Sequence, residues 1–593
     1  MKYRIYGIYT ILSLAVAACA HGAPEEDGPS SSESEVVLHT LADVNRVEEA
    51  PDSHKGWEFR STLEALEILS LGKNVLSIED PYYPRIKKCS DGTFLLMWQN
   101  GQIASSIYFC TSPDLKNWSV PKKLFSPVDI ATPDGNDVRR YSSADAVVLS
   151  DGEVIAVSSF RAHKGYKYHP QCNGISIRRS GDNGKTWSEE QIIYKGTNWE
   201  PYILELPSGR LHCYFTDTDP LLRNSGTSLV RSDDKGYSWT PSEPGQRERV
   251  IRQYKYTNQG TRIYTDQMPC IRMLNDGHTL LGFIEARLEE GNVPEGKSSY
   301  KMGLVYGKDD WKTLADDEEG PVDRQPNLFL GGGGYVAQFR SGETLVSCNI
   351  SGLLSIKTGT CDGRTFRGKS WEDGWFRPFE GKGCWGSTEV ISSHEILATM
   401  NDIENGTIQL GRFYLNHRID APRQEVFVDG SGDEWTADQA LFAGASGAGA
   451  SAILRASHDG ENLHLLVECS DKDLDKKDGF ALCLTPDGAA SLEGALRVSY
   501  TLEGGVSFSA YSSSWKETRI DGAQFETTVL GTPSDGKKDR GYVAEISLPL
   551  SSLKGSSSGC ILVDMILSDG DKRLTFTGVD SLNPAGWLPI RLL

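Results

Sequence analysis

The stretch Ser-Gly-Asp-Asn-Gly-Lys-Thr-Trp at residues 180–187 decides the fold of this 593-residue chain, because it returns as Ser-Asp-Asp-Lys-Gly-Tyr-Ser-Trp at residues 232–239. Each copy follows an apolar run typical of a β-strand, at residues 174–178 and 227–231. In a turn the Asp can accept hydrogen bonds from backbone amides, the Gly can adopt a positive φ and the Trp can pack back over the hairpin. Both copies therefore predict β-hairpin turns.

A longer repeat surrounds the two motifs. An apolar run, a small or acidic residue followed by Gly, and a second apolar run recur along the chain, with successive turn glycines 60, 57, 68 and 65 residues apart. This period, with room for about four strands, is typical of β-propeller blades. A sixth unit without the turn Gly fits residues 387–399 and 407–415. We predict a six-bladed propeller over residues 75–420, with seven blades as the alternative because the segment before Pro84 is hard to divide. The turn glycines are Gly92, Gly152, Gly209, Gly277 and Gly342.

The two turn motifs resemble the Asp-box, or BNR repeat, of the sialidase superfamily of β-propellers. Degenerate copies at residues 112–118 and 362–366 fall where the repeat predicts them. In that superfamily the box is a structural element of the propeller rim. The resemblance therefore implies the architecture and says little about the substrate.

The beginning of the chain predicts export. Lys2 and Arg4 precede an apolar stretch at residues 8–18 that ends at Cys19, which resembles a bacterial lipoprotein signal with Cys19 as the lipidated residue. An ordinary signal peptide with a chance Cys is the alternative, and the apolar stretch is too short for a stable membrane-spanning helix. Residues 20–74 are predicted to form a tether and an N-terminal segment. We expect a lipid-anchored protein of the bacterial cell envelope, in the outer membrane, and the acidic stretch after Cys19 is similar to surface-export signals.

Composition narrows the range of partners. The net charge of -20 disfavours nucleic acid and polybasic membrane binding. Eleven cysteines remain besides Cys19, and several lie in apolar strand-like runs, where a buried free thiol is the ordinary interpretation. Because the chain has no CxxC pair or close Cys/His cluster, no zinc site is suggested. We expect no metal and no cofactor, and the oligomeric state stays open.

The C-terminal part, residues 421–593, has a different pattern. It opens with Val-Asp-Gly-Ser-Gly-Asp-Glu-Trp at residues 428–435, and residues 456–467 alternate polar and apolar around an Asp-Gly turn. This pattern resembles the family 9 carbohydrate-binding-module-like domain, which implies a β-sandwich. The predicted fold class is therefore all-β, a propeller followed by a β-sandwich. Trp435, Trp515 and Trp587 can stack on sugar rings, although Trp in a small sandwich is more often part of the core.

Two carboxylates are the main candidates for chemistry. Glu200 begins the third blade, and Glu285 ends a mostly apolar run at residues 279–284 in the fourth. A carboxylate in such a place must find a partner or change its pKa, which is how a general acid near neutral pH is made. Paired carboxylates at the axial mouth of a propeller are what glycoside cleavage needs. The alternative is a structural pair between Glu285 and Arg287, with Glu200 capping a loop.

Residues 199–202, and residues 266–269 leading to Ile284 and Glu285, resemble segments of glycoside hydrolase family 93. That family consists of six-bladed exo-arabinanases that retain configuration with two Glu residues. The resemblance implies Glu200 and Glu285 as the catalytic pair, and leaves open which of them is the acid. The residues implied around the sugar are Trp199, Tyr202, Tyr264, Asp266 and Arg287.

True sialidases offer a competing resemblance. Tyr83-Pro84-Arg85-Ile86 is similar to their first arginine motif, which implies that Arg85 binds substrate, and Glu200 with residues 204–209 is similar to the Glu segment. The second arginine of the carboxylate-binding triad is absent at residues 215–217, and the Tyr nucleophile is absent at residues 384–389. Without the triad, sialic acid loses its main charge-assisted anchor.

Other polar residues rank lower. Asp145, at the start of an inner strand of the second blade, can bind a sugar hydroxyl or bond backbone amides. Arg161, His163 and His169 can line the mouth, although isolated loop histidines are usually solvated. The run Gly331–Gly334 predicts a close backbone approach at the mouth.

The sequence therefore favours an exo-acting glycoside hydrolase that cleaves terminal sugar units from a polysaccharide or oligosaccharide. An exo-sialidase and a non-catalytic, surface glycan-binding lipoprotein are the alternatives.

Overall fold

The computed structural model describes residues 36–44, 58–77, 80–219, 221, 224–256, 260, 262–288, 299–325, 329–368, 370–445, 447–489, 491–553, 559–576 and 582–593. The predicted lipidation site, Cys19, lies outside these residues. Strands hold 54% of the chain and helices 3%, which confirms the all-β class. Among the described residues no helix is long and apolar enough to cross a membrane. The helical elements are α1 (Lys73–Leu76) and single turns at Glu58–Arg60, Pro170–Cys172, Leu550–Ser552 and Pro584–Gly586.

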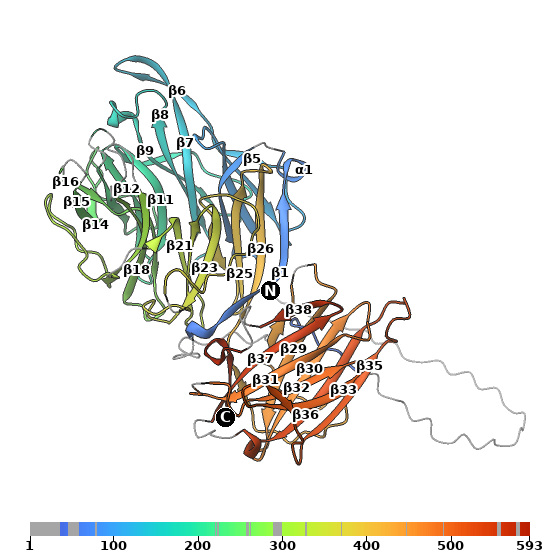
Figure 1. Ribbon diagram of the computed structural model, residues 1–593. Coiled ribbons are helices and arrows are strands. Elements are labelled where there is room, and N and C mark those ends of the chain that lie inside the picture. Colours follow the sequence, from blue (N-terminus) through green and yellow to red (C-terminus); the bar gives the residue numbers. More distant parts are fainter. Residues whose placement is uncertain are drawn as a thin grey trace, which may run out of the picture.

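Six antiparallel sheets follow one another through the first two thirds of the described chain (Figure 1). The first holds β2 (Pro81–Lys88), β3 (Phe94–Asn100), β4 (Ile107–Ser112) and β5 (Lys122–Phe125). The second holds β6 (Val128–Thr132), β7 (Gly135–Val148), β8 (Val154–Ala162), β9 (Gly174–Ser180) and β10 (Gln191–Lys195). The third holds β11 (Asn198–Glu205), β12 (Leu211–Asp219), β13 (Asn224–Ser232) and β14 (Glu248–Ile251).

A hairpin of β15 (Gln253–Tyr256) and β16 (Arg262–Thr265) leads to the remaining three sheets. The fourth holds β17 (Gln267–Met273), β18 (Thr279–Leu288), β19 (Ser299–Lys308) and β20 (Phe329–Leu330). The fifth holds β21 (Gly332–Gln338), β22 (Thr344–Ile350) and β23 (Leu353–Gly359). The sixth holds β24 (Ser387–Val390), β25 (Glu395–Asp402), β26 (Thr407–Asn416) and β1 (Thr62–Leu71).

The six sheets close into a ring. Their innermost strands contact one another in the cyclic order β2, β7, β11, β17, β21, β24 and back to β2. Apolar side chains fill the spaces between neighbouring sheets, as between the third, fourth and fifth sheets. This arrangement confirms the predicted propeller.

The outer strand of the sixth sheet comes from the other end of the ring. β1 pairs with β26 from Thr62↔Asn416 to Leu71↔Ile408, so the first strand of the ring completes its last sheet. β1 precedes residue 75, where the sequence predicted the propeller to begin, and the ring therefore starts earlier than expected. The repeat could not place it, because β1 stands alone before the first complete unit.

The two motifs that decide the fold form the predicted turns, after β9 and after β13. Asp182 Oδ1 accepts a hydrogen bond from Thr186 N at 2.8 Å, and Ser180 Oγ accepts one from Gly184 N at 2.9 Å. Gly184 has a φ of 80°, which favours glycine. In the second copy Trp239 Nε1 donates to Gly236 O at 3.0 Å. The motif therefore fastens each turn through its own side chains.

The C-terminal part is a sandwich of two sheets beside the ring (Figure 1). One sheet runs in the order β27 (Ile419–Ala421), β39 (Leu588–Leu592), β37 (Cys560–Asp569), β31 (Gly479–Pro486), β32 (Leu496–Thr501), β33 (Gly505–Tyr511) and β34 (Trp515–Glu517), with β38 (Lys572–Thr575) on β37. The other runs in the order β28 (Leu441–Ala443), β29 (Ala450–His458), β30 (Asn462–Asp471), β36 (Gly541–Pro549) and β35 (Gln524–Leu530). One apolar core lies between them, which confirms the predicted β-sandwich.

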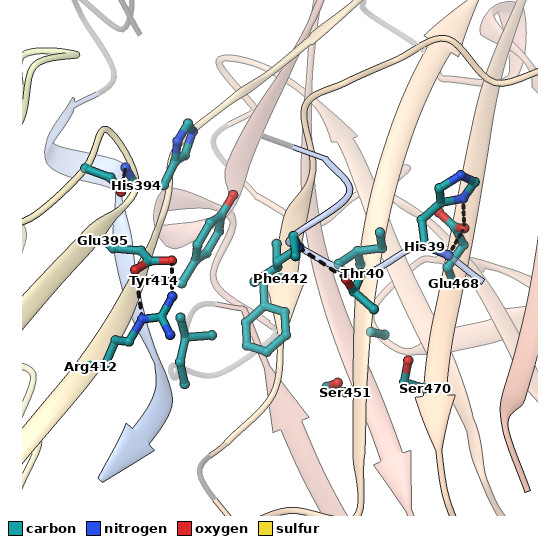
Figure 2. Close-up of a pocket in the computed structure, with 16 residues that line it drawn as sticks. His39, Thr40, His394, Glu395, Arg412, Tyr414, Phe442, Ser451, Glu468 and Ser470 are labelled. Atoms are coloured by element: carbon teal, nitrogen blue, oxygen red, sulfur yellow. Dashed lines mark hydrogen bonds and ion pairs between the residues drawn. The ribbon is translucent and has the colours of Figure 1, made fainter. Parts of the chain in front are cut away.

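A cavity of about 360 Å³ lies between the sixth sheet and the sandwich (Figure 2). Residues 39–42 line one side of it, and His39 bonds Glu468 Oε1 through its backbone N at 2.9 Å and through Nδ1 at 2.7 Å. Arg412 pairs with Glu395 on the opposite wall. No residue of the predicted site lines this cavity.

Candidate active site

A β-bulge repeats in the innermost strands of the ring. In five of them the pairing register shifts at the same place, and a residue with positive φ stands nine positions before the turn glycine. A bulge of this kind re-aims side chains and holds a strained backbone. Glu200 is one of these residues, with a φ of 42°. The five are Tyr83, Ser143, Glu200, Met268 and Gly333.

Glu200 is half-buried at its bulge. Thr216 Oγ1, on β12, donates a 2.7 Å hydrogen bond to Glu200 Oε2. Met268 N donates to Thr216 Oγ1 at 2.8 Å, so the hydroxyl proton is directed at Glu200. Burial raises the pKa of Glu200 to about 7, although the bond from Thr216 opposes the shift.

Glu285 faces Gln267 across the pairing of β17 and β18 and is 7% exposed. Its Oε1 accepts a hydrogen bond from Gln267 Nε2 at 2.9 Å, and its Oε2 accepts one from Gly333 N at 2.8 Å. Burial raises the pKa of Glu285, while these two donors oppose the shift. A Cβ at Gly332 would lie 3.0 Å from Glu285 Oε2, so the glycine run makes the predicted close approach.

The two carboxylates lie within electrostatic reach of each other. The negative charge of Glu285 raises the pKa of Glu200 further. Burial, followed by the charges of Glu285 and Glu200, raises the pKa of Tyr300. Glu200, Glu285 and Tyr300 therefore share one site.

A cation and two aromatic rings border this site. Arg161 lies with its guanidinium carbon 3.2 Å from the ring centre of Trp199, and the Tyr166 ring meets Trp199 edge-on at 5.8 Å. Burial lowers the pKa of Arg161 to about 10, and Glu200 opposes that shift. Arg161 therefore lies near both Trp199 and Glu200, and Tyr166 is a further residue of this wall. His169 is not in this wall, because it bonds Asp134 at 2.6 Å.

Three of the predicted substrate-binding residues lie deeper, in the buried axis of the ring. Arg85 is 3% exposed, donates to Trp385 O at 2.8 Å and is covered by the Tyr83 ring at 3.8 Å. Asp145 is 2% exposed and lies 3.5 Å from Lys87 Nζ. The Tyr202 ring is buried against that of Tyr335. Arg85, Asp145 and Tyr202 each stand two residues after a bulge residue, where the strand points to the axis.

The last three predicted residues come from the hairpin and the strands beside it. Asp266 is fully buried and accepts a hydrogen bond from Arg324 Nη1 at 3.0 Å. Tyr264 packs edge-on against Tyr254 at 6.1 Å. Arg287 is half-buried, and its positive charge lowers the pKa of Tyr300. Only Arg287 of these three is therefore tied to the Glu pair.

The tryptophans of the sandwich divide into two kinds. Trp587 is fully buried, and Trp435 is 7% exposed with Nε1 donating to Glu545 Oε1 at 2.7 Å. Both belong to the core. Trp515 is half-buried and lies edge-on to Tyr511 at 5.3 Å.

The cysteines of the described chain are all free thiols, and eight of the eleven are buried. Cys213 and Cys483 lie inside strands β12 and β31 and are buried, as their apolar surroundings in the sequence indicated.

No protein-family model and no curated protein matches this chain. Solved structures are similar to it at low identity. A protein of unknown function from Dyadobacter fermentans DSM 18053 shares 14% identity over 60% of this chain and 99% of that chain, with a TM-score of 0.42. A Penicillium chrysogenum α-L-arabinanase complexed with arabinobiose shares 16% over 60% and 98%, with a TM-score of 0.39. The Trypanosoma rangeli sialidase complexed with the inhibitor DANA shares 9% over 87% and 90%, with a TM-score of 0.38. All three TM-scores are below 0.5, so these similarities carry no argument about the substrate of this chain.

Proposed function

We propose that this protein is an exo-acting glycoside hydrolase that removes terminal sugar units with Glu200 and Glu285. The observation that carries the proposal is a pair of carboxylates that interact electrostatically, both with raised pKa values, on β11 of the third sheet and β18 of the fourth. Glycoside cleavage needs one carboxyl group to protonate the leaving oxygen and another to act at the anomeric carbon.

The hydrogen bonds divide the two roles. Both oxygens of Glu285 accept from Gln267 Nε2 and Gly333 N, which favours the ionised form. Glu200 accepts through Oε2 only, and no described residue donates to its Oε1. Glu200 therefore gives its proton to the glycosidic oxygen, and Glu285 attacks the anomeric carbon or activates a water.

The pH dependence follows from this division. Glu200 is protonated below its pKa of about 7, so the acid is lost as the pH rises. The value of kcat/KM should fall about tenfold per pH unit above that pKa. A pH profile of initial rates checks this expectation. Activity that instead falls on acidification through pH 7 would reverse the two roles.

The hydrogen bond from Thr216 should affect the pH at which kcat/KM begins to fall. Its hydrogen bond favours the carboxylate form of Glu200, so Thr216→Val removes a contribution that lowers the pKa. The basic limb of kcat/KM should move to higher pH in Thr216→Val, whereas Thr216→Ser keeps the hydroxyl and the original limb. Identical profiles in the two variants would contradict a role for this bond.

A product screen tests the proposal itself. The chain without residues 1–35 is incubated with arabinan oligosaccharides, sialyllactose and a mixed plant and host glycan panel, and products are read by mass spectrometry. Release of a neutral mono- or disaccharide supports the hydrolase and names the sugar. The anomer of the first product, read by NMR, distinguishes retention from inversion.

An exo-sialidase is the second candidate. The positive charges of Arg161 and Arg85 act on Glu200, and a sialic acid carboxylate needs cations. Arg85, however, donates to the backbone carbonyls of Pro84 and Trp385 beneath the Tyr83 ring. Release of sialic acid that is lost in Arg85→Ala would establish this candidate against the first.

The remaining expectations complete the proposal. Tight oligosaccharide binding without product would favour a non-catalytic, surface glycan-binding lipoprotein, with the half-buried Trp515 on the sandwich as a place to look for sugar contact. Lipid attachment at Cys19 predicts palmitate labelling that Cys19→Ala abolishes.

A further inference from the structure

Three aspartates meet where the two sheets of the sandwich come together. Asp471 ends β30 in the five-stranded sheet, while Asp478 precedes β31 and Asp569 ends β37 in the other sheet. One carboxylate oxygen of each lies within 4.8 Å of the others. Asp471 and Asp478 are 2% and 1% exposed, and Asp569 is half-buried.

The backbone already holds these side chains in place. Asp478 Oδ1 accepts a hydrogen bond from Gly570 N at 2.6 Å, and its Oδ2 accepts one from Asp475 N. Asp569 Oδ2 accepts from Gly449 N at 3.2 Å. Asp471 Oδ1 accepts from Asp473 N at 3.0 Å, which fixes the direction of its carboxylate.

The other oxygen of Asp471 has no donor. Its Oδ2 is buried and has no hydrogen-bond partner in the part of the chain that the structure describes. Burying a carboxylate oxygen without a partner is costly, and the cost grows beside two further carboxylates.

Lys472, Lys538 and Arg540 line a cavity with Asp471, so cations lie near the cluster. Within the described ranges, Lys572 is the cation paired with it, and its Nζ lies 3.9 Å from Asp569 Oδ2. That distance is at the long limit of an ion pair. The close approach of three carboxylates and the unpartnered Oδ2 of Asp471 point to the same absent partner, a cation among the three.

We propose that Asp471, Asp478 and Asp569 bind one Ca²⁺ ion that joins the two sheets of the sandwich. Carboxylate oxygens are hard ligands, and a site without nitrogen or sulfur suits Ca²⁺ rather than Zn²⁺. Mg²⁺ demands near-ideal octahedral geometry, whereas Ca²⁺ accepts the irregular set that three backbone-held carboxylates offer. The ion supplies the partner that Asp471 Oδ2 lacks.

In a second acidic cluster, by contrast, the buried carboxylate has hydrogen-bond donors for both of its oxygens. Asp429, Glu434 and Glu545 also lie within 4.8 Å of one another. Glu545 is fully buried, but its Oε2 accepts from Gly430 N at 2.7 Å and its Oε1 from Trp435 Nε1 at 2.7 Å. Its oxygens have their donors already, so we propose no ion there.

Calorimetric titration of the purified chain without residues 1–35 with CaCl₂, after EDTA treatment and dialysis, tests the site. We expect one Ca²⁺ per chain and a higher Tm of the sandwich with Ca²⁺. Asp471→Asn should abolish both effects. In the absence of Ca²⁺ this variant should be at least as stable as the wild type, because it loses repulsion and no donor.

Asp571→Asn is the matched control. It removes the same charge two residues after Asp569, from a side chain that is 94% exposed, and should bind Ca²⁺ like the wild type. Asp478→Asn provides a second variant, with circular dichroism as the check on folding. The site is overturned if the wild type does not bind Ca²⁺. It is also overturned if Asp471→Asn and Asp478→Asn both bind Ca²⁺ as tightly as the wild type. Equal affinity for MgCl₂ overturns the choice of Ca²⁺. None of these readouts depends on glycoside cleavage, so the failure of one proposal does not affect the other.

Discussion

Glu200→Gln and Glu285→Gln should each remove almost all glycoside turnover while the chain stays folded. Loss of a positioned acid or base costs about 10²- to 10⁴-fold in rate, and loss of the group that acts at the anomeric carbon costs at least as much. Initial rates on the oligosaccharide found in the product screen, compared with thermal melts, measure both quantities.

The hydrogen bonds explain why folding should survive. In Glu200→Gln the new amide oxygen would accept from Thr216 Oγ1 as the carboxylate does, with the amide nitrogen on the side that has no described donor. In Glu285→Gln the new amide can donate to Gln267 once that side chain turns its oxygen toward it, and still accept from Gly333 N. Glu205→Gln, on the same strand as Glu200, is the control and should keep the wild-type rate. Substantial activity in both catalytic variants would exclude the Glu pair.

Lys87→Met should lower the free energy of unfolding by about 3–5 kcal/mol, because it leaves a buried charge without its partner. Lys87 is 8% exposed, donates to Tyr335 Oη at 2.8 Å and lies 3.5 Å from Asp145 Oδ1 and 3.4 Å from Glu389 Oε2. Burial alone lowers the pKa of Lys87, but the charges of Asp145 and Glu389 outweigh it and raise the pKa above its ordinary value. Urea titration followed by tryptophan fluorescence measures the loss.

Two further variants isolate the charge. Lys88→Met changes the neighbouring exposed residue, which donates to Ile391 O, and should shift the free energy by about 0.5 kcal/mol or less. Adding Asp145→Asn to Lys87→Met should recover part of the loss, because the uncompensated charge is removed. A double variant that is less stable than the sum of the single losses would show that packing, and not charge, holds the axis.

The fold was predictable because its signal is local and repeated. Each turn glycine and each Asp-box predicts one hairpin, and the spacing between them predicts how many strands form one sheet. The bulge nine residues before each glycine was not predictable, because Tyr83, Ser143, Glu200, Met268 and Gly333 share no side-chain chemistry. Their common feature is a backbone angle set by the packing of inner strands around the axis. Only the ring as a whole imposes it.

The candidate site was predictable in part for a similar reason. Glu285 ends an apolar run, which marks it locally, whereas Thr216 and Gln267 acquire their roles only when neighbouring sheets meet. Arg85 and Asp145 were expected at the mouth. The structure buries both side chains, which are 3% and 2% exposed, two residues after a positive-φ bulge residue that no sequence pattern marks. The three aspartates of the sandwich also have no common motif, since β31 to β37 separate Asp478 from Asp569.

The pairing of β1 with β26 sets the order in which the chain can fold. Thr62 leaves the ribosome about 350 residues before its partner Asn416, so β1 stays without its neighbour until the sixth sheet has been made. Such distant pairing slows folding and exposes an unpaired strand edge in the meantime. An incomplete chain therefore carries an open edge at its beginning.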